Sequence, residues 1–125
     1  MKKSNRLDVV CIDLILKYIG NLREAYDTYN ITSKVELKRA TLCHLAVTQL
    51  ITNIYQSKQK MSEKIIDDTP IFSRLQKALK AARNIASHEY GELNFGLLHE
   101  LATELLAKDL IEELEAIKDA LKHNS

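Results

Sequence analysis

The stretch LCHLAVTQLITNIY, residues 42–55, decides the fold that this 125-residue chain is expected to adopt. Its apolar side chains fall on nearly all sides of a helix rather than along one stripe. A helix of this kind is enclosed by neighbouring helices or by a partner subunit. The stretch therefore predicts a central helix that begins near Ser33 and runs to about Lys60.

Ahead of this helix, apolar side chains recur every three or four residues between Leu7 and about Asp27 and predict a first long helix. Its expected apolar face contains Leu7, Val10, Cys11, Leu14, Ile15, Tyr18, Leu22 and Ala25. The pattern stops at residues 30–33. Ser33 followed three residues later by Glu36 has the form of a capping box, in which each side chain satisfies a free backbone amide of the new helix.

After the central helix, a short polar stretch at residues 62–68 precedes Thr69 and Pro70, which have the residue types of an N-cap and a first helical position. They predict a third long helix with the apolar face Phe72, Leu75, Leu79, Ala82 and Ile85. Gly91 is able to end that helix in the left-handed conformation, and a turn is expected up to Asn94.

The last part of the chain keeps a helical period that changes phase near Lys108 and Asp109, which predicts two short helices or one bent helix. Connections this short favour antiparallel neighbours. The expected fold class is therefore all-α, an antiparallel four- to five-helix bundle. A chain of this length closes one hydrophobic core, so residues 1–125 are expected to form a single domain.

Composition narrows the class of protein. Hydrophobic residues make up 46% of the sequence and charged residues 28%, which is typical of a globular protein rather than a disordered or membrane chain. Asp8, Asp13 and Lys17 interrupt any signal-peptide core, and no run approaches the roughly 18 apolar residues of a membrane span, so the cytoplasm is the expected location. Cys11 and Cys43 lack metal-ligand spacing, and neither zinc nor a disulfide framework is expected.

The segment RNIASHEYG, residues 83–91, groups an arginine, an imidazole and a phenol at a predicted helix end. Cutting RNA without a metal ion needs a group that takes the proton of a ribose 2′-hydroxyl and a cation that stabilises the phosphate under attack. His88 has the chemistry for the first role and Arg83 for the second. Because the net charge is only +1, RNA affinity must come from such a local site.

One copy of this segment makes a poor site, because residues five apart are rotated by about 140° on an ideal helix. Arg83 and His88 of one chain therefore point in different directions, whereas Asn84 and His88, four apart, share a face. Two copies packed across a two-fold axis would bring both sets into one cleft. The candidate site thus predicts a homodimer or a higher homo-oligomer.

The spacing of Arg83 and His88 has little specificity by itself, since Arg39 and His44 repeat it inside the central helix, where a structural role is expected. A surface arginine and a capping histidine would also explain the later pair. His44 is expected in the core or at an interface, and His99 and His123 at the surface. The acidic residues near the helix ends are interpreted as solvated, and no metal site is expected.

Context makes the motif more specific. Arg83-x4-His88-x-Tyr90, at the end of a helix late in a small helical domain, resembles the R-x4-H-x-Y motif of the HepT family of HEPN toxins. Asn84 matches the family's common Arg-Asn pair, and helix order and length are similar over about residues 7–117. QLITN, residues 49–53, also looks like the second-helix segment that faces the active cleft of the family.

The resemblance implies a homodimeric, metal-independent endoribonuclease toxin without a cofactor. Its partners would be RNA and a cognate minimal nucleotidyltransferase antitoxin that silences it by adding AMP to the motif tyrosine. By position, Arg83 and His88 would be catalytic, Asn84 and Asn53 supporting, and Tyr90 the modification site. Related toxins often have an aspartate at the position of Asn53, which implies reduced or altered activity here.

Two other interpretations stay open at this point. The chain could be a non-catalytic helical partner that presents substrates to a separately encoded nucleotidyltransferase. It could also be a structural helical dimer in which the motif only caps a helix.

Overall fold

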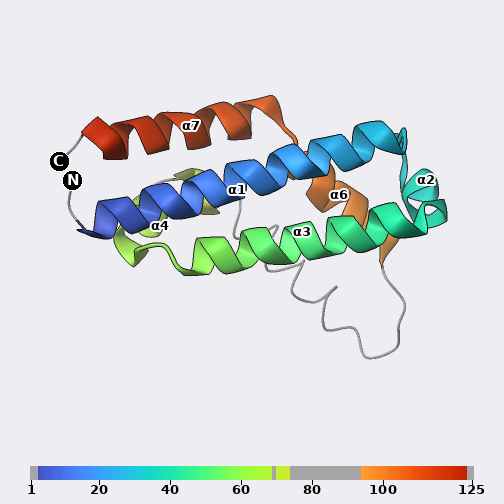
Figure 1. Cartoon of the computed structure of the whole chain (residues 1–125), viewed down its shortest axis with the longest axis horizontal. Helices are drawn as coiled ribbons and strands as arrows, with labels where there is room; N and C mark the ends of the chain where they lie inside the picture. Colours follow the sequence, from blue (N-terminus) through green and yellow to red (C-terminus); the bar gives the residue numbers. More distant parts are fainter. Residues whose placement is uncertain (1–2, 69, 74–93, 124–125) are drawn as a thin grey trace.

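The computed structural model describes residues 3–68, 70–73 and 94–123, and the regular structure of these residues is entirely helical, which confirms the all-α helical bundle (Figure 1). Residues 70–73 are helical as well. The labelled elements are α1 (Lys3–Thr28), α2 (Lys34–Arg39), α3 (Thr41–Gln59), α4 (Glu63–Asp68), α6 (Phe95–Leu105) and α7 (Lys108–His123). No helix in the described ranges is long and apolar enough to cross a membrane.

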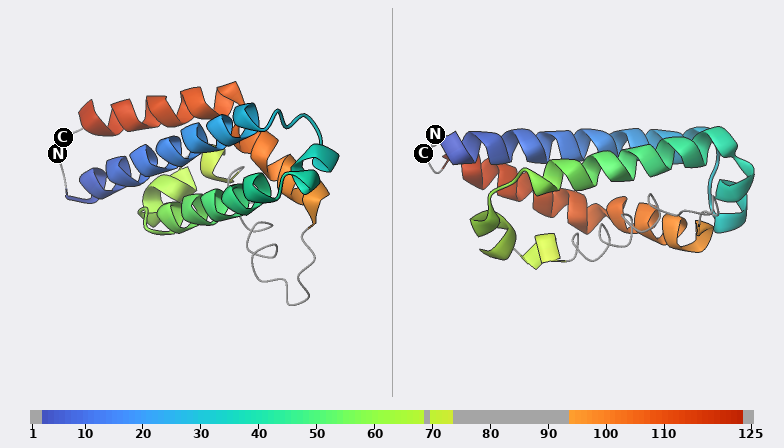
Figure 2. Two further views of the ribbon diagram at one scale, coloured as in Figure 1. Left: turned by 45° about the vertical axis from the view of Figure 1, so that its right-hand side comes forward. Right: turned by 90° about the horizontal axis from the view of Figure 1, so that it is seen from below.

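Helix α1 is the centre of the arrangement, because it packs along both α3 and α7 (Figures 1 and 2). It runs antiparallel to each of them, and the start of α1 lies near the end of α7. At the other end of the molecule the short α2 packs against α6. The shared core consists of fully buried aliphatic side chains from the three long helices, among them Ile12, Ile15, Leu22, Val47, Ile54, Leu110 and Leu114. Each contributes roughly 1.5–3 kcal/mol by leaving water.

The buried face of α1 differs from the expected one. Leu7 and Val10 are 50% and 54% exposed, whereas the side chains that enter the core are Asp8, Cys11, Ile12, Ile15, Ile19, Leu22 and Tyr26. The prediction for Cys11, Ile15 and Leu22 is confirmed, and the prediction for Leu7 and Val10 is wrong. Apolar residues occupy more than one side of α1, and the positions of α3 and α7 decide which of them are covered.

The predicted central helix is interrupted at Ala40, whose backbone angles of φ −90° and ψ 80° leave the helical region. Ser33 does start a helix, since its side chain accepts a hydrogen bond from the Glu36 backbone amide. That helix, α2, ends at Arg39, and α3 begins at Thr41. Neither a proline nor a glycine marks this break in the sequence. The backbone of Ala40 stays hydrogen-bonded on both sides, because its amide donates to the Glu36 carbonyl and its carbonyl accepts from the His44 amide.

His44 helps to accommodate this break. In an unbroken helix the Leu37 carbonyl would accept from the backbone amide of residue 41. Instead, Nδ1 of the buried His44 ring lies 3.0 Å from the Leu37 carbonyl oxygen and hydrogen-bonds to it. The expected core position of His44 is confirmed, and its role is to satisfy a backbone group that the change of direction releases.

Later boundaries follow the sequence signals more closely. Asn94 is the N-cap of α6 and accepts a hydrogen bond from the Leu97 amide at 3.1 Å, as its place at the end of the expected turn allows. The phase change near Lys108 separates α6 from α7, so the two-helix alternative is the correct one. The polar stretch at residues 62–68, expected as a connection, instead contains the short helix α4.

A buried carboxylate joins the start of α1 to the connection between α3 and α4. Asp8 is only 2% exposed and accepts two hydrogen bonds from Ser62, one from the backbone amide at 2.8 Å and one from the hydroxyl at 2.7 Å. These bonds connect segments that are distant in the sequence. They also compensate for removing a carboxylate from water, which is otherwise costly.

Candidate functional site

Most of the predicted site lies outside the residues that the structure describes. Arg83, Asn84, His88 and Tyr90 lie outside the described residues, as do Gly91 and most of the expected third long helix. Asn53, the remaining candidate, lies on α3. The site can therefore be built only from α3 and from the described residues that precede and follow the motif segment.

Asn53 lies on the half-exposed side of α3 and is held by its neighbour one turn earlier. Gln49 donates from Nε2 to the Asn53 side-chain carbonyl oxygen at 2.9 Å. The Asn53 backbone carbonyl accepts from the Ser57 hydroxyl at 3.0 Å. The side-chain NH2 group keeps donor hydrogens that a phosphate or ribose oxygen could accept. Asn53 thus has a fixed position and a neutral polar group, but no carboxylate that could take a proton.

The chain is anchored to the core on both sides of the motif segment. Before it, Ile71 and Phe72 are buried, Phe72 completely. After it, Phe95 follows the N-cap residue of α6, and its ring meets the His44 ring edge-on at a centroid distance of 4.8 Å. The described flanks of the segment are therefore attached to the same core as α3.

His99 takes part in a second contact of α6, contrary to the expectation that it lies free at the surface. Its ring is parallel to the ring of the buried Tyr26, with centroids 5.8 Å apart, and its Nδ1 lies 2.9 Å from the Tyr26 hydroxyl oxygen. The contact attaches α6 to the C-terminal half of α1. An isolated histidine in an amphipathic helix carries no sequence signal for this partner, which is distant in the chain.

Burial raises the pKa of Tyr26 above its usual value of 10, and the nearby Cys43 adds to this. We expect the free energy of unfolding to fall above about pH 10, because the unfolded tyrosine then ionises more readily than the folded one, at a cost of up to about 1.4 kcal/mol per pH unit. Below pH 10 Tyr26 keeps its proton in both the folded and the unfolded chain, so its contribution to the free energy of unfolding is fully present. Denaturant unfolding at about pH 9 and about pH 11 measures this difference.

The matched variants are Tyr26→Phe, which removes the ionisable group, and Tyr29→Phe, which removes an exposed one. The alkaline loss of stability should shrink in Tyr26→Phe and persist in Tyr29→Phe. An unchanged loss in Tyr26→Phe would show that Tyr26 does not cause it.

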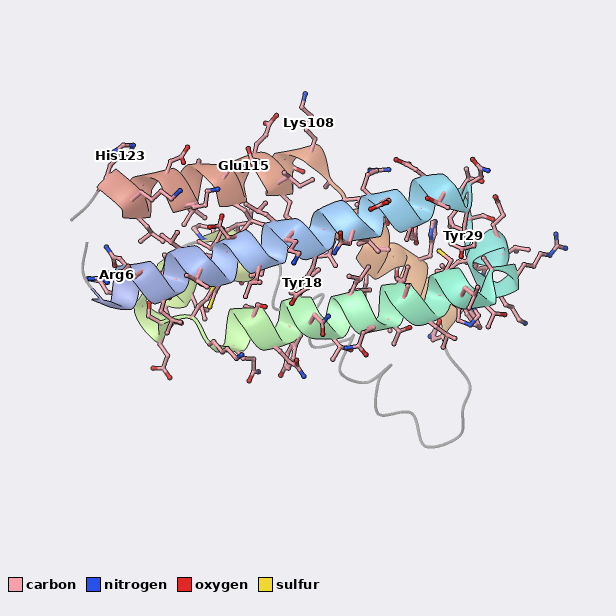
Figure 3. All side chains as sticks on the ribbon, viewed as in Figure 1. Arg6, Tyr18, Tyr29, Lys108, Glu115 and His123 are labelled. Atoms are coloured by element: carbon pink, nitrogen blue, oxygen red, sulfur yellow. The ribbon has the colours of Figure 1, made fainter. Side chains whose placement is uncertain are left out.

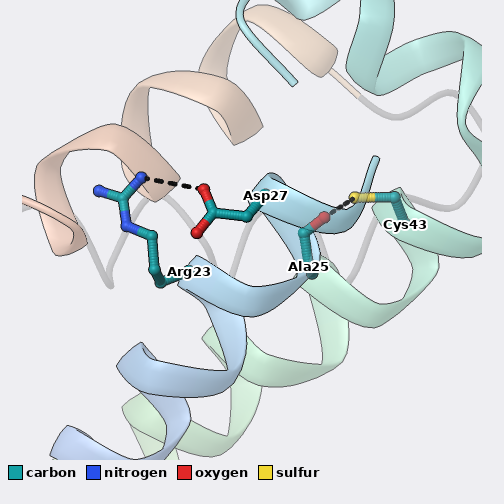
Figure 4. A network of polar contacts seen from close by, with 4 residues as sticks. All are labelled: Arg23, Ala25, Asp27 and Cys43. Carbon is teal, nitrogen blue, oxygen red and sulfur yellow. Dashed lines mark hydrogen bonds and ion pairs between the residues drawn. The ribbon is translucent and has the colours of Figure 1, made fainter. Parts of the chain in front are cut away.

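The two cysteines are poor candidates for chemistry. Both thiols are free and buried, and Cys43 donates to the Ala25 carbonyl oxygen at 3.8 Å (Figure 4). Burial raises the pKa of both, and the Asp8 charge raises that of Cys11 further. Because the thiolate is the reactive and metal-binding form, these positions disfavour nucleophilic or ligand roles.

The basic side chains of the described helices differ in their surroundings. The side chains of Lys108 and His123 project away from the bundle at opposite ends of α7, and Lys118 pairs with Asp13 of α1 at 3.0 Å (Figure 3). Lys58 is different, because it is only 6% exposed on α3 and burial lowers its pKa. Among the described residues no group of three His, Cys, Asp or Glu side chains could hold a metal ion.

Comparison with known proteins adds no relative to this picture. No family model matches the chain, and neither the curated proteins nor the solved structures give a match.

The sequence did not predict the buried Asp8, the buried Lys58 or the Tyr26–His99 contact. Asp8 had one usable signal, since it stands one turn before Ile12 and Cys11 on a side of α1 that is otherwise apolar.

Proposed function

We propose that this protein is an endoribonuclease of the HepT type that acts as a homodimer and needs no metal ion. The observation that carries the proposal is the motif Arg83-x4-His88-x-Tyr90 within an all-α bundle. The location of Asn53 on α3, with its side chain held by Gln49, supports a polar surface on that helix. A toxin role and the cytoplasm as its place of action belong to the same proposal.

In the proposed reaction His88 takes the proton from a ribose 2′-hydroxyl, and the resulting oxygen attacks the adjacent phosphorus. The bond from phosphorus to the 5′-oxygen of the next nucleotide breaks, and that oxygen leaves as a hydroxyl with the proton that the histidine has taken, so the step conserves protons. Arg83 stabilises the charge that builds on the phosphate oxygens. The products carry a 2′,3′-cyclic phosphate and a 5′-hydroxyl, and no water enters this step.

Tyr90 is the proposed site of control. A cognate nucleotidyltransferase that adds AMP to its hydroxyl would place a bulky phosphodiester two residues from His88. The new negative charge would pair with Arg83 and compete with the RNA phosphate. This mechanism makes the AMP group an inhibitor that occupies the place of the substrate.

The decisive test is incubation of the purified protein with cellular RNA in excess EDTA, followed by analysis of the fragment ends. We expect cleavage with 2′,3′-cyclic phosphate ends. Intact RNA under conditions in which the protein is dimeric would remove the nuclease proposal.

Replacing Asn53 with aspartate is expected to raise the rate of RNA cleavage. We expect Asn53→Asp to increase the cleavage rate at least about tenfold, because a carboxylate can assist proton transfer or hold the histidine in its charged form. The substitution keeps the acceptor that Gln49 uses, so the fold should be unaffected. Asn21→Asp adds the same charge at an exposed position of α1 and serves as the control. A rate for Asn53→Asp no higher than that of Asn21→Asp would contradict the proposed role.

The neutral side chain of Asn53 also favours a second candidate, a non-catalytic helical partner of a separately encoded nucleotidyltransferase. This function predicts a stable complex with that enzyme and normal growth when the chain is expressed alone. Growth arrest that is lost in Arg83→Ala would exclude it and favour the nuclease.

A further inference from the structure

Gln49 is an exposed residue of α3 that spends a side-chain hydrogen bond on Asn53. Its Nε2 donates to the Asn53 side-chain carbonyl oxygen at 2.9 Å, across one turn of the helix. Residues 40–57 include no lysine, arginine, aspartate or glutamate, so no charged side chain of α3 competes for either amide. Such pairs on a helix surface add little to stability. The main consequence of the bond is therefore the direction in which the Asn53 amide points.

Gln49 is the neighbour on α3 that fixes the Asn53 side chain. At the other positions one turn away, Leu50 is apolar, and Ser57 donates its hydroxyl to the Asn53 backbone carbonyl rather than to the side chain. Gln56 makes no hydrogen bond with Asn53 in the described part of the helix. Removing the Gln49 amide would thus free the Asn53 side chain without removing its backbone contact.

The bond also decides which end of the Asn53 amide is left unused. A side-chain amide has an acceptor oxygen at one end and two donor hydrogens at the other. Because Gln49 occupies the oxygen, the NH2 group of Asn53 is directed away from Gln49. The half-exposed Asn53 thus offers donors, and donors are what the phosphate and ribose oxygens of RNA accept.

We propose that Gln49 is a positioning residue for RNA cleavage, which acts through Asn53 and does not itself bind the substrate. It keeps the Asn53 side chain in one rotamer with the NH2 group available to an RNA oxygen. The RNA then binds without having to order this side chain first, which preserves affinity. The inference rests on the proposed function, because RNA is the substrate that Asn53 would bind.

The first measurement is made on the full chain without RNA. Three-bond NMR couplings of the Asn53 side chain report whether its χ1 torsion occupies one rotamer or averages over several. We expect one rotamer in the wild type, averaging in Gln49→Ala, and wild-type couplings in the control Gln56→Ala. Averaged couplings in the wild type, or unchanged couplings in Gln49→Ala, would overturn the inference whether or not the protein cuts RNA.

The second measurement is kcat and KM on a labelled single-stranded RNA in EDTA. Gln49→Ala is expected to raise KM about three- to tenfold with little change in kcat, because only the ordering of a binding group is lost. Gln49→Ala/Asn53→Ala should be no worse than Asn53→Ala, since Gln49 then has nothing to hold. Gln56→Ala should keep the wild-type KM. A full second loss in the double variant would show that Gln49 acts independently of Asn53.

Two further replacements test the direction of the amide. Gln49→Lys can only donate and should keep the Asn53 NH2 group outward, whereas Gln49→Glu can only accept and should turn the amide round. Gln56→Lys and Gln56→Glu add the same charges elsewhere on α3 and correct for their effect on RNA affinity. After this correction, KM should be near the wild-type value in Gln49→Lys and at least as high as that of Gln49→Ala in Gln49→Glu. Equal corrected values would contradict the proposed orientation.

The inference and the nuclease can fail separately. A wild type that cuts no RNA would reject the proposed function, and the couplings alone would then decide whether Gln49 orders Asn53. An active wild type in which Gln49→Ala keeps both the KM and the couplings would reject the role of Gln49 and leave the nuclease standing.

Discussion

Replacing His88 with alanine is expected to lower the rate of RNA cleavage at least about 100-fold, because the variant loses the imidazole that is proposed to take the proton from the 2′-hydroxyl at neutral pH. Arg83→Ala should cost about 100- to 1,000-fold by removing the cation that stabilises the phosphate charge. Initial rates on a labelled RNA in EDTA, with the dimer mass checked for each variant, measure both effects.

Two surface positions provide controls for these substitutions. His123 is exposed at the end of α7, and Arg23 forms only a solvent-exposed pair with Asp27 at 3.8 Å (Figure 4). His123→Ala should keep the wild-type rate because its side chain is exposed. Arg23→Ala should keep it as well, since an exposed pair like that of Arg23 with Asp27 contributes about 0.5 kcal/mol or less to stability. Equal losses in the controls, or wild-type rates in His88→Ala, would contradict the catalytic assignment.

The composite nature of the site allows a sharper version of this experiment. If each cleft takes Arg83 from one chain and His88 from the other, a mixed dimer of Arg83→Ala and His88→Ala chains contains one complete cleft. Random mixing should then recover up to about a quarter of the wild-type activity from two inactive proteins. If both residues of a cleft came from the same chain, mixing would restore nothing.

Helix boundaries that depend on local chemistry could be read from the sequence. Ser33 and Asn94 bind free amides of the helices that follow them, and these signals depend only on neighbouring residues. The break at Ala40 depends instead on the His44 ring reaching the Leu37 carbonyl, a contact that residue types alone do not indicate. Local capping is thus predictable from the sequence. A helix break is not, when the backbone carbonyl that it releases is hydrogen-bonded by a side chain of the next helix.

The same distinction applies to burial and to the candidate site. Leu7 and Val10 fit the helical period as well as Ile15 does, but the packing of α3 and α7 leaves them exposed. The motif at residues 83–90 is recognised from residue types and spacing, while the cleft that would unite two copies is a property of the assembly. That cleft stays a prediction, as does the role of Asn53 beside it.

Removing the Asp8 carboxylate is expected to have the largest effect on stability. Asp8→Ala would leave the Ser62 amide and hydroxyl without their acceptor at the junction of α1 with the connection between α3 and α4. Hydrogen bonds to a charged acceptor contribute about 1.5–3 kcal/mol each, and an unpaired buried donor adds its own cost. We expect a loss of about 3 kcal/mol in the free energy of unfolding, measured by urea denaturation.

Asp13→Ala is the matched control, because Asp13 is an exposed aspartate of the same helix whose partner is Lys118. Its removal should cost less than about 1 kcal/mol, since water reaches the exposed Asp13 carboxylate and weakens its pair with Lys118. Asp8→Asn tests the mechanism, because the amide keeps one acceptor oxygen but not the charge. Its loss in the free energy of unfolding should fall between those of Asp8→Ala and Asp13→Ala. If Asp8→Ala were no more destabilising than Asp13→Ala, the bonds to Ser62 would not hold these helices together, and the start of α1 would depend on aliphatic packing alone.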